Sequence, residues 1–493
     1  MDELMYRSTR GRSEAVSSAK AIVEGIAPDG GLYVPDHIPA PLASLEEMLH
    51  LSYKELSYAV MKPFLPDFTQ EELQDCLQYA YNDRFDTPEQ VVLNEQGPVS
   101  FLELFHGPTL AFKDMALSVL PRLMTTAAAK IGIRQEIVIL TATSGDTGKA
   151  AMDGFANVPG VRILVFYPTD GVSPMQKRQM VTQRGDNTFV IAVDGNFDDA
   201  QRSVKEIFTD PAEKERMLEA GYVFSSANSI NIGRLLPQIV YYFRGYTEAV
   251  NHGRIRLGDP VTFSVPTGNF GDILAGHYAK RMGLPIDRLL CASNRNNVLT
   301  DFFHTGRYDS NREFYVTSSP SMDILVSSNL ERLIYEITGE NGARVEQYMK
   351  SLKDTGAYTL AEGVGALQNE FGAFYADEKE TQETISYFFR KYGYVIDPHT
   401  AVAASCALRE DLNPHSHTII VSTASPYKFP KTILESLGAT PPIDAWDQVQ
   451  VLSIISGTPV PTPVSELNGL PVRHTAVCSV DGAREAVHET LGI

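Results

Sequence analysis

Apolar positions over the first 95 residues recur mostly at helical spacing. In residues 45–65, LEEMLHLSYKELSYAVMKPFL, the side chains on one face of the expected helix are Leu45, Met48, Leu49, Tyr53 and Leu56. A second helix is expected in residues 69–85, and the Gly- and Pro-rich stretch APDGGLYVPDHIPAPL precedes both. We therefore predict a mixed, mainly helical N-terminal domain over residues 1–95.

From about residue 136 the pattern changes to short apolar runs rich in β-branched residues, each followed by a helical pattern. The runs are EIVILTA, VRILVFYP, TFVIAVDG, VTFSV, RLLCASN and HTIIVSTAS. This alternation predicts parallel strands joined by crossover helices, and hence an α/β fold. Ligands of such folds bind at the carboxyl ends of the strands, so the loops that follow these runs are where we expect the chemistry.

Length and charge limit the class of protein. A chain of 493 residues predicts two or three domains. Acidic residues outnumber basic ones by 61 to 42, for a net charge of −19, which argues against a nucleic-acid partner but leaves room for a local anion pocket. The four cysteines form no CxxC pair and the 11 histidines no HExxH spacing, so no metal site is predicted. With no signal peptide and no run of transmembrane length, we expect a soluble, cytoplasmic protein without a membrane partner.

One lysine stands in an unusual place, within the mostly apolar run LELFHGPTLAFKDMAL. Lys113 lies between Phe112 and Asp114. Burial of an ammonium group is costly, so such a lysine either extends its amine to solvent and pairs with Asp114, or is neutral part of the time. A partly neutral lysine can form a Schiff base or shuttle protons.

Two strand-to-helix loops are typical of small-anion sites. In PTGNFGD, Gly268 and Gly271 permit tight turns before a helix whose free N–H groups could hold a phosphate, although G-x-G-x-x-G is absent and an ordinary turn is the alternative. The loop TATSGDTGKAA is not an ATP loop, because Thr143 and Ala150 stand where the motif needs Gly and Ser or Thr. Its hydroxyls and amides suit a small carboxylate, with a plain N-cap at residue 144 or 146 as the alternative.

A third loop, IIVSTASPYKFP, ends a strand at Ser422 and Thr423, which could present a hydroxyl to a ligand or simply cap the next helix. In DPHTAVAASCAL, Asp397 and Pro398 are placed as the N-cap and first residue of a buried helix. Four of these features fit a single pair of ligands that bind together: the lysine in an apolar run, the loop that suits a phosphate, the loop that suits a carboxylate, and the hydroxyl at a strand end. That pair is pyridoxal phosphate with an amino acid.

The motifs HGPTLAFKD, TSGDTG, PTGNFGD and STASPYKFP, with YRSTRG, APDGGLYVP and SSNLER, resemble the threonine synthase family. The resemblance is to its longer bacterial and fungal type, among the fold-type II pyridoxal-phosphate enzymes. It runs in order from Tyr6 to beyond Pro430. It implies two α/β lobes with the cofactor between them: a large cofactor-binding domain over 96–135 and 230–493, and a small α/β domain over 136–229.

The resemblance also implies roles for individual residues. Lys113 would be the Schiff-base lysine, with a pKa lowered by burial beside Phe112 and by the start of the next helix. Thr423 would bond the pyridine nitrogen. The cofactor phosphate would be bound by Gly268, Asn269, Phe270, Gly271 and Asp272. The substrate α-carboxylate would be bound by Thr143, Ser144, Gly145, Asp146 and Thr147. Asp146 departs from the asparagine that many fold-type II relatives have there.

The implied reaction converts O-phospho-L-homoserine and water into L-threonine and phosphate. Further donors suit the substrate phosphate, although they could equally be helix caps and surface pairs: Arg295, Asn296, Asn297, Ser327, Ser328, Asn329 and Arg332. A serine or threonine dehydratase would share the lysine and the phosphate loop, and a non-catalytic relative would bind phosphorylated amino acids without a link to Lys113. We expect a monomer or a homodimer.

Overall fold

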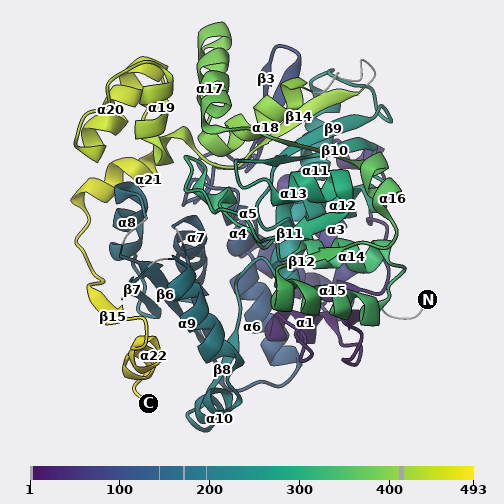
Figure 1. Ribbon diagram of the computed structural model, residues 1–493, viewed down its shortest axis with the longest axis vertical. Coiled ribbons are helices and arrows are strands. Elements are labelled where there is room, and N and C mark those ends of the chain that lie inside the picture. The colour runs from purple at the N-terminus through teal and green to yellow at the C-terminus, as the bar shows by residue number, and fades with distance from the viewer. Residues whose placement is uncertain (1–3, 144, 170–171, 196, 410–415) are drawn as a thin grey trace.

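The computed structural model describes residues 4–143, 145–169, 172–195, 197–409 and 416–493. The chain forms two α/β lobes and an N-terminal domain. Figure 1 shows the smaller lobe at the lower left and the larger sheet at the upper right.

Six strands form the sheet of the large domain, in the order β13-β10-β9-β14-β4-β3. They are β3 (Val92–Gln96), β4 (Val99–Glu103), β9 (Val261–Pro266), β10 (Ile286–Ser293), β13 (Phe371–Tyr375) and β14 (His417–Ser422). Neighbouring strands are parallel except for β3 and β4, an antiparallel pair at one edge. Every residue of β9 is buried, as is typical of a central parallel strand covered on both faces. The predicted α/β fold is confirmed.

Five parallel strands form the small sheet, in the order β15-β7-β6-β5-β8. They are β5 (Glu136–Ala142), β6 (Val161–Pro168), β7 (Thr188–Asp194), β8 (Tyr222–Ser225) and β15 (Ala476–Ser479). The prediction that all of 230–493 belongs to the large domain is wrong at its end, because β15 pairs with β7. This strand is short and mostly exposed, so no hydrophobic pattern marks it. The other domain limits stay a prediction.

The N-terminal domain contains a small antiparallel sheet and four short helices. Its elements are β1 (Tyr6–Ser8), α1 (Ser18–Glu24), β2 (Tyr33–Pro35), α2 (Leu45–Met48), α3 (Tyr53–Met61), the 3₁₀ turn η1 (Lys62–Phe64) and α4 (Gln70–Ala80). The single helix expected over 45–65 is wrong, since it is broken into α2, α3 and η1. Ser44 and Ser52 each form a capping box, with Glu47 and Glu55, and so start separate helices.

Helices cover both sheets. In the large domain they are α5 (Asp114–Leu117), α6 (Leu120–Lys130), α11 (Ile232–Asn251), α12 (Gly271–Arg281), α13 (Val298–Thr305), α14 (Leu330–Ile337), α15 (Gly342–Thr355), α16 (Val364–Glu370), α17 (Glu378–Tyr392), α18 (Pro398–Arg409), α19 (Pro430–Ser436), α20 (Ala445–Ser456) and α21 (Thr462–Ser465). In the small domain they are α7 (Asp146–Phe155), α8 (Pro174–Val181), α9 (Phe197–Thr209), α10 (Pro211–Glu219) and α22 (Ala483–Leu491).

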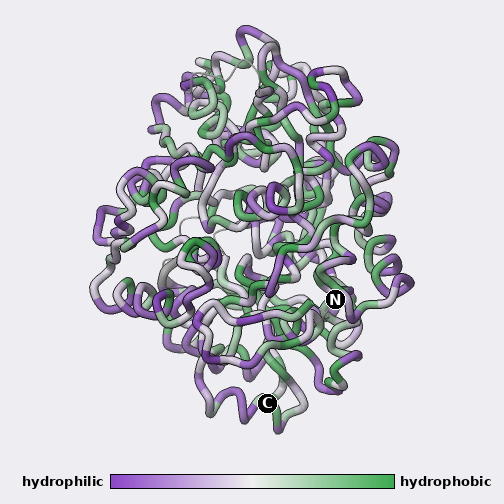
Figure 2. Tube along the Cα trace, turned by 90° about the vertical axis from the view of Figure 1, so that its right-hand side faces the viewer, coloured by the Kyte–Doolittle hydropathy of each residue, from purple (hydrophilic) through white to green (hydrophobic). Residues whose placement is uncertain are grey.

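Hydrophilic and hydrophobic residues alternate along the peripheral helices in Figure 2, as expected for helices with one face on a core. Within the described ranges, no helix has both the length and the apolar character needed to cross a membrane. Two further strands, β11 (Arg307–Asp309) and β12 (Ala357–Thr359), form a separate antiparallel pair.

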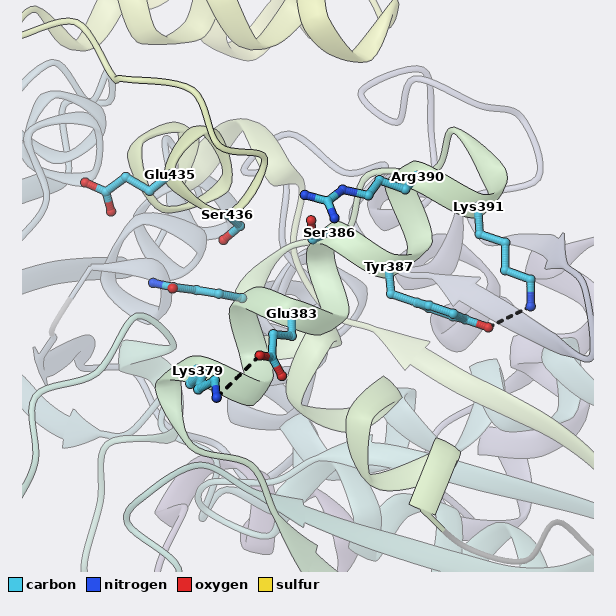
Figure 3. Close-up of a pocket in the computed structure, with 9 residues that line it drawn as sticks. Lys379, Glu383, Ser386, Tyr387, Arg390, Lys391, Glu435 and Ser436 are labelled. Carbon is cyan, nitrogen blue, oxygen red and sulfur yellow. Dashed lines mark hydrogen bonds and ion pairs between the residues drawn. The ribbon is translucent and has the colours of Figure 1, made fainter.

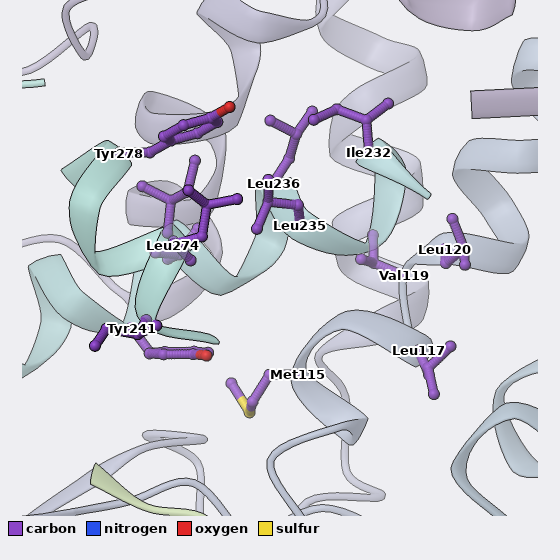
Figure 4. Packing of buried hydrophobic residues seen from close by; sticks show 14 of the residues in the cluster. Met115, Leu117, Val119, Leu120, Ile232, Leu235, Leu236, Tyr241, Leu274 and Tyr278 are labelled. Carbon is purple, nitrogen blue, oxygen red and sulfur yellow. The ribbon is translucent and has the colours of Figure 1, made fainter. Parts of the chain in front are cut away.

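Helix α11 lies at the centre of the main hydrophobic core. Its Leu235 and Leu236 belong to the same buried cluster as Leu274 of α12 and Met115 of α5, and Figure 4 shows these side chains together. Burial of each such side chain contributes about 1.5–3 kcal/mol. This packing fixes α5, which begins directly after Lys113, against α11, and α11 packs in turn on α12.

Candidate active site

Lys113 lies between the end of β4 and the start of α5, and its segment is fixed to the end of β14. The Phe112 N–H donates to the Thr423 carbonyl at 2.8 Å, and the Ser425 N–H donates to the Leu110 carbonyl at 3.0 Å. Lys113 itself is only 8% exposed. The backbone therefore brings together the lysine and the strand-end threonine, which are 310 positions apart in the sequence.

The Lys113 amine lies among a few polar groups. Its Nζ is 3.5 Å from the Ser321 hydroxyl and 3.8 Å from Oδ2 of Asp146. Burial lowers its pKa to about 8, the charge of Asp146 opposes this shift, and the charge of Arg234 adds to it. An amine with that pKa is neutral in about a tenth of molecules at pH 7, against roughly one in a few thousand for an ordinary lysine. The lysine is thus available as a nucleophile and as a base.

We expect Asp146→Asn to move the pKa of Lys113 below about 8, because the variant removes the carboxylate that holds the ammonium while Arg234 and Lys428 still repel it. At pH values below 8, more of the amine is then neutral. The apoenzyme is acetylated with acetic anhydride at a series of pH values, and peptide mass spectrometry measures the acetylation of Lys113. The pH at which its acetylation rate is half-maximal gives the midpoint of the Lys113 titration.

Asp153→Asn, in the same helix α7, is the matched control and should leave the Lys113 midpoint in place, since Asp153 pairs with Arg84 and Lys149. A wild-type midpoint in Asp146→Asn would show that the Asp146 carboxylate does not set the pKa of Lys113.

A second buried lysine, not among the predicted site residues, fixes Asp146. Lys428 Nζ lies 2.8 Å from Asp146 Oδ1 and donates to the Thr109 carbonyl at 3.0 Å, and its side chain is fully buried. The Gln176 amide donates to the same carboxylate oxygen at 3.0 Å. Both lysines hold the pKa of Asp146 well below its usual range. Lys428 stands between Tyr427 and Phe429, the same sequence signal that marked Lys113.

The remaining residues of the SGDTG loop shape the start of α7. The Thr143 hydroxyl accepts the N–H groups of Gly145 and Gly148 at 3.0 and 2.9 Å. Gly145 has a φ of +141°, and a Cβ there would lie 2.5 Å from the Gln176 side chain, so only glycine fits. Thr147 is half-buried in the first turn, and Ser144 lies outside the described residues. The assignment of this loop to a carboxylate stays a prediction.

The PTGNFGD loop leads from β9 into α12. Phe270 adopts a left-handed φ of +62°, and the ring packs against Phe303 and Phe371. A Cβ at Gly268 would lie 2.8 Å from the Ser321 carbonyl oxygen. The first N–H groups of α12 have no acceptor within the helix, so the loop offers bare backbone donors at a helix N-terminus.

Asp272, in the first turn of α12, directs its carboxylate to α11. It accepts hydrogen bonds from the hydroxyls of Tyr241 at 2.5 Å and Tyr242 at 2.8 Å, and burial raises its pKa to about 6. Only its backbone N–H can therefore serve a phosphate.

Thr423 follows β14, and both of its backbone polar groups are engaged. Its carbonyl accepts from Phe112, and its N–H donates to the Thr400 hydroxyl at 3.3 Å. The side chain is buried beside the Lys113 segment, which leaves its hydroxyl as the group that could meet a ligand.

Two family models match the chain, one after the other. Residues 5–81 match the threonine synthase N terminus, and residues 94–424 match the pyridoxal-phosphate dependent enzymes. Over 90% of its length the chain is 38% identical to threonine synthase from Pseudomonas aeruginosa, of which it covers 92%. The chain belongs to the threonine synthase family.

Solved structures agree with this family. Yeast threonine synthase matches with a TM-score of 0.87 and 32% identity, over 99% of both chains. The pyridoxal-phosphate-bound threonine synthase from Brucella melitensis matches with a TM-score of 0.84 and 35% identity, over 99% of this chain and 98% of that one. The resemblance stated from the motifs, the fold-type II architecture and the cofactor are confirmed.

The residues of this threonine synthase family member fit pyridoxal 5′-phosphate. The buried Lys113 amine would hold the cofactor aldehyde, and the backbone donors of residues 268–272, where a side chain at Gly268 has no room, would hold the phosphate. The Thr423 hydroxyl would meet the ring nitrogen. A neutral hydroxyl there, unlike a carboxylate, does not stabilise a protonated ring.

The residues predicted for the substrate phosphate have protein partners. Ser327 Oγ donates to the Gly268 carbonyl at 2.8 Å, and Asn329 Nδ2 donates to the Asn269 carbonyl at 3.0 Å. Asn296 Nδ2 donates to the Tyr315 carbonyl at 2.8 Å. The others differ in burial: Ser328 is half-buried, Asn297 is half-buried, Arg295 is exposed, and Arg332 is buried.

Arg234 on α11 was not predicted and is a better candidate for an anion. It is 4% exposed, its Nη1 donates to the Ala227 carbonyl at 3.0 Å, and its Nε has no partner. Among the described residues, no carboxylate lies within ion-pair distance of it. Burial lowers its pKa to about 10, and its charge acts on Lys113. A buried guanidinium that has no carboxylate partner among the described residues, and whose charge acts on Lys113, is suited to a phosphate ligand. The sequence signal that could have identified Arg234 is the run NSINIGR, a largely polar stretch directly before an apolar helical pattern.

A surface hollow of about 670 Å³ lies elsewhere, between α17 and α19 (Figure 3). Its lining includes the Lys379–Glu383 ion pair and the hydrogen bond from Lys391 to Tyr387. None of the predicted site residues lines it.

Proposed function

We propose that this protein is a threonine synthase that converts O-phospho-L-homoserine and water into L-threonine and inorganic phosphate. The observation that carries the proposal is the similarity to threonine synthases over nearly the whole chain, including the N-terminal model. The buried Lys113 amine, with its pKa of about 8, supports it.

Lys113 performs the acid–base steps in this proposal. Pyridoxal phosphate, when bound, supplies the electron sink that makes the substrate Cα–H acidic. The Lys113 amine takes protons from Cα and Cβ and delivers protons to Cγ and back to Cα, while the Cγ–O bond breaks and phosphate leaves with the bonding pair. Water adds its oxygen at Cβ, keeps one proton as the new hydroxyl group and gives the other proton to the departing phosphate. One mobile amine serves these transfers because they occur on neighbouring carbons.

Two helix starts bind the substrate's charges in this proposal. The N–H groups and Thr147 hydroxyl at the start of α7 face the α-carboxylate, in line with the predicted role of residues 143–147. The substrate phosphate pairs with Arg234, since Asn296, Ser327 and Asn329 are engaged within the protein.

We expect Arg234→Gln to lower kcat/KM for O-phospho-L-homoserine by about 100-fold, because the variant removes a buried charge from the leaving phosphate. Binding of L-homoserine, which lacks the phosphate, should change little. The control Arg244→Gln lies ten residues along the same helix, is also buried and pairs with Glu248 at 3.0 Å. Equal losses of kcat/KM in the two variants would show that the effect comes from a lower stability of α11 and not from the substrate phosphate.

The function is tested by following phosphate and amino acid together, with purified protein, pyridoxal phosphate and O-phospho-L-homoserine. Equimolar phosphate and L-threonine are expected. Phosphate with 2-oxobutyrate and no threonine would identify a lyase that does not add water. Cofactor binding without either product would leave a non-catalytic binder.

We also propose that the enzyme works in the cytoplasm, as a monomer or homodimer, on this small-molecule substrate. Its four free cysteines, three of them buried, are compatible with a reducing compartment.

A further inference from the structure

Two successive carbonyls of the PTGNFGD loop are held by the segment that precedes α14. Ser327 Oγ donates to the Gly268 carbonyl at 2.8 Å. The Asn269 carbonyl accepts two hydrogen bonds from Asn329, from its backbone N–H at 3.1 Å and from its side-chain Nδ2 at 3.0 Å.

These bonds set the direction of the loop's donors. A trans peptide is planar, and its N–H points opposite to its C=O. When the carbonyls of Gly268 and Asn269 point to residues 327–329, the N–H groups of Asn269 and Phe270 must point to the other side. The segment at 327–329 thus aims two backbone donors away from itself, at the place where the loop would bind an anion.

The orientation of the Asn329 amide is itself fixed by an arginine. Arg332 Nη1 donates to Asn329 Oδ1. A guanidinium has donors only, so Asn329 must turn its oxygen to Arg332 and its Nδ2 to the Asn269 carbonyl. Nδ2 also donates to the Ser229 hydroxyl, at 3.1 Å.

Arg332 is fixed in turn by the N-terminal domain. It is 1% exposed, its Nε donates to the Tyr33 carbonyl of β2 at 2.9 Å, and its Nη2 donates to the Ile230 carbonyl. Its neighbour Glu331 pairs with Arg10 at 3.1 Å and accepts from the Thr9 hydroxyl at 2.6 Å. A chain of buried contacts therefore runs from β2 through Arg332 and Asn329 to the loop.

We propose that Asn329 and Arg332 are positioning residues for the cofactor phosphate, and that through them the N-terminal domain sets the affinity for pyridoxal phosphate. The proposal rests on the assignment of residues 268–272 to that phosphate. Neither side chain needs to touch the cofactor, because both act through the direction of the loop amides.

Asn329→Asp is the sharpest test. The aspartate keeps the size and can accept from Arg332, but its second oxygen faces the Asn269 carbonyl and repels it. We expect the apoenzyme to bind pyridoxal 5′-phosphate about 10- to 100-fold more weakly and pyridoxal, which lacks the phosphate, with unchanged affinity. Equilibrium dialysis with each compound gives the ratio of the two dissociation constants, which a general loss of stability would not change. Arg332→Lys keeps the charge but loses the planar guanidinium whose Nε, Nη1 and Nη2 reach three separate acceptors, and it should shift the ratio in the same direction.

The matched control is Asn187→Asp in the small domain, since Asn187 Nδ2 also donates to backbone carbonyls, those of Phe155 and Val161. It should leave the ratio unchanged. Gly268→Ala tests the loop itself, because the added Cβ meets the Ser321 carbonyl. A changed ratio in Gly268→Ala with wild-type ratios in Asn329→Asp and Arg332→Lys would overturn the positioning role and leave the phosphate site standing. Unchanged ratios in all three would overturn the phosphate assignment as well.

Discussion

Lys113→Ala is expected to abolish threonine formation, with kcat lower by about 10³-fold or more, because in the proposed mechanism Lys113 is both the attachment point of the cofactor and the amine that moves protons. Its position supports this size of effect. The amine is buried, its pKa is lowered to about 8, and its segment is fixed to the end of β14 by backbone hydrogen bonds. The buried Lys428 is less free than Lys113, because its ammonium is engaged by Asp146 and the Thr109 carbonyl.

Two measurements check this prediction. The first is the joint release of phosphate and threonine by wild type and variant. The second is borohydride reduction of the cofactor-loaded protein followed by peptide mass spectrometry, which should find the cofactor on Lys113 in the wild type and nowhere in Lys113→Ala. Lys149→Ala, which removes another lysine close to the site, should keep both signals. Cofactor found on Lys428 would contradict the prediction, because it would show that Lys428 and not Lys113 forms the linkage.

The parallel strands were well predicted, since their cores are apolar on both faces. The run VRILVFYP coincides with β6, and EIVILTA with β5. The single helix expected over 45–65 is wrong because hydrophobic periodicity alone does not show where one helix ends and the next begins. The capping serine at residue 52 marks the start of the second helix. Strand β15 could not be predicted, because its side chains are largely exposed and its pairing with β7 is set by the fold.

The residues of the candidate site also divide into those that a sequence pattern marks and those that only the fold brings together. The two glycine loops and Thr423 stood out because each follows a predicted strand, and Lys113 stood out because it lies in a mostly apolar run. Ser321 and Arg234 did not, since their proximity to Lys113 depends on how the lobes and α11 pack. The predicted substrate-phosphate donors Ser327 and Asn329 bond the carbonyls of the predicted cofactor-phosphate loop, and sequence spacing cannot show such a contact.

The pair of Lys428 and Asp146 joins the two lobes. Lys428 ends the 3₁₀ turn η3 (Pro426–Lys428), which follows β14 of the large domain, and Asp146 begins α7 of the small domain. Both side chains are buried and 2.8 Å apart. Burial makes each charge costly without the other, so this contact is sensitive to the loss of either partner.

We therefore expect Lys428→Met to lower stability by about 3–5 kcal/mol, because it leaves the Asp146 carboxylate buried without its main counter-ion. Urea unfolding of the apoenzyme measures the loss as a lower midpoint, and turnover should fall with it as α7 loses its anchor. The double variant with Asp146→Asn should recover most of the stability, since an amide can accept from Gln176 and needs no cation. If instead the two single losses add within about 0.5 kcal/mol, the charges are independent and some other contact joins the lobes. Recovery without restored turnover would separate two roles of Asp146: its part in the fold, which an asparagine can fill, and its charge beside Lys113, which an asparagine cannot supply.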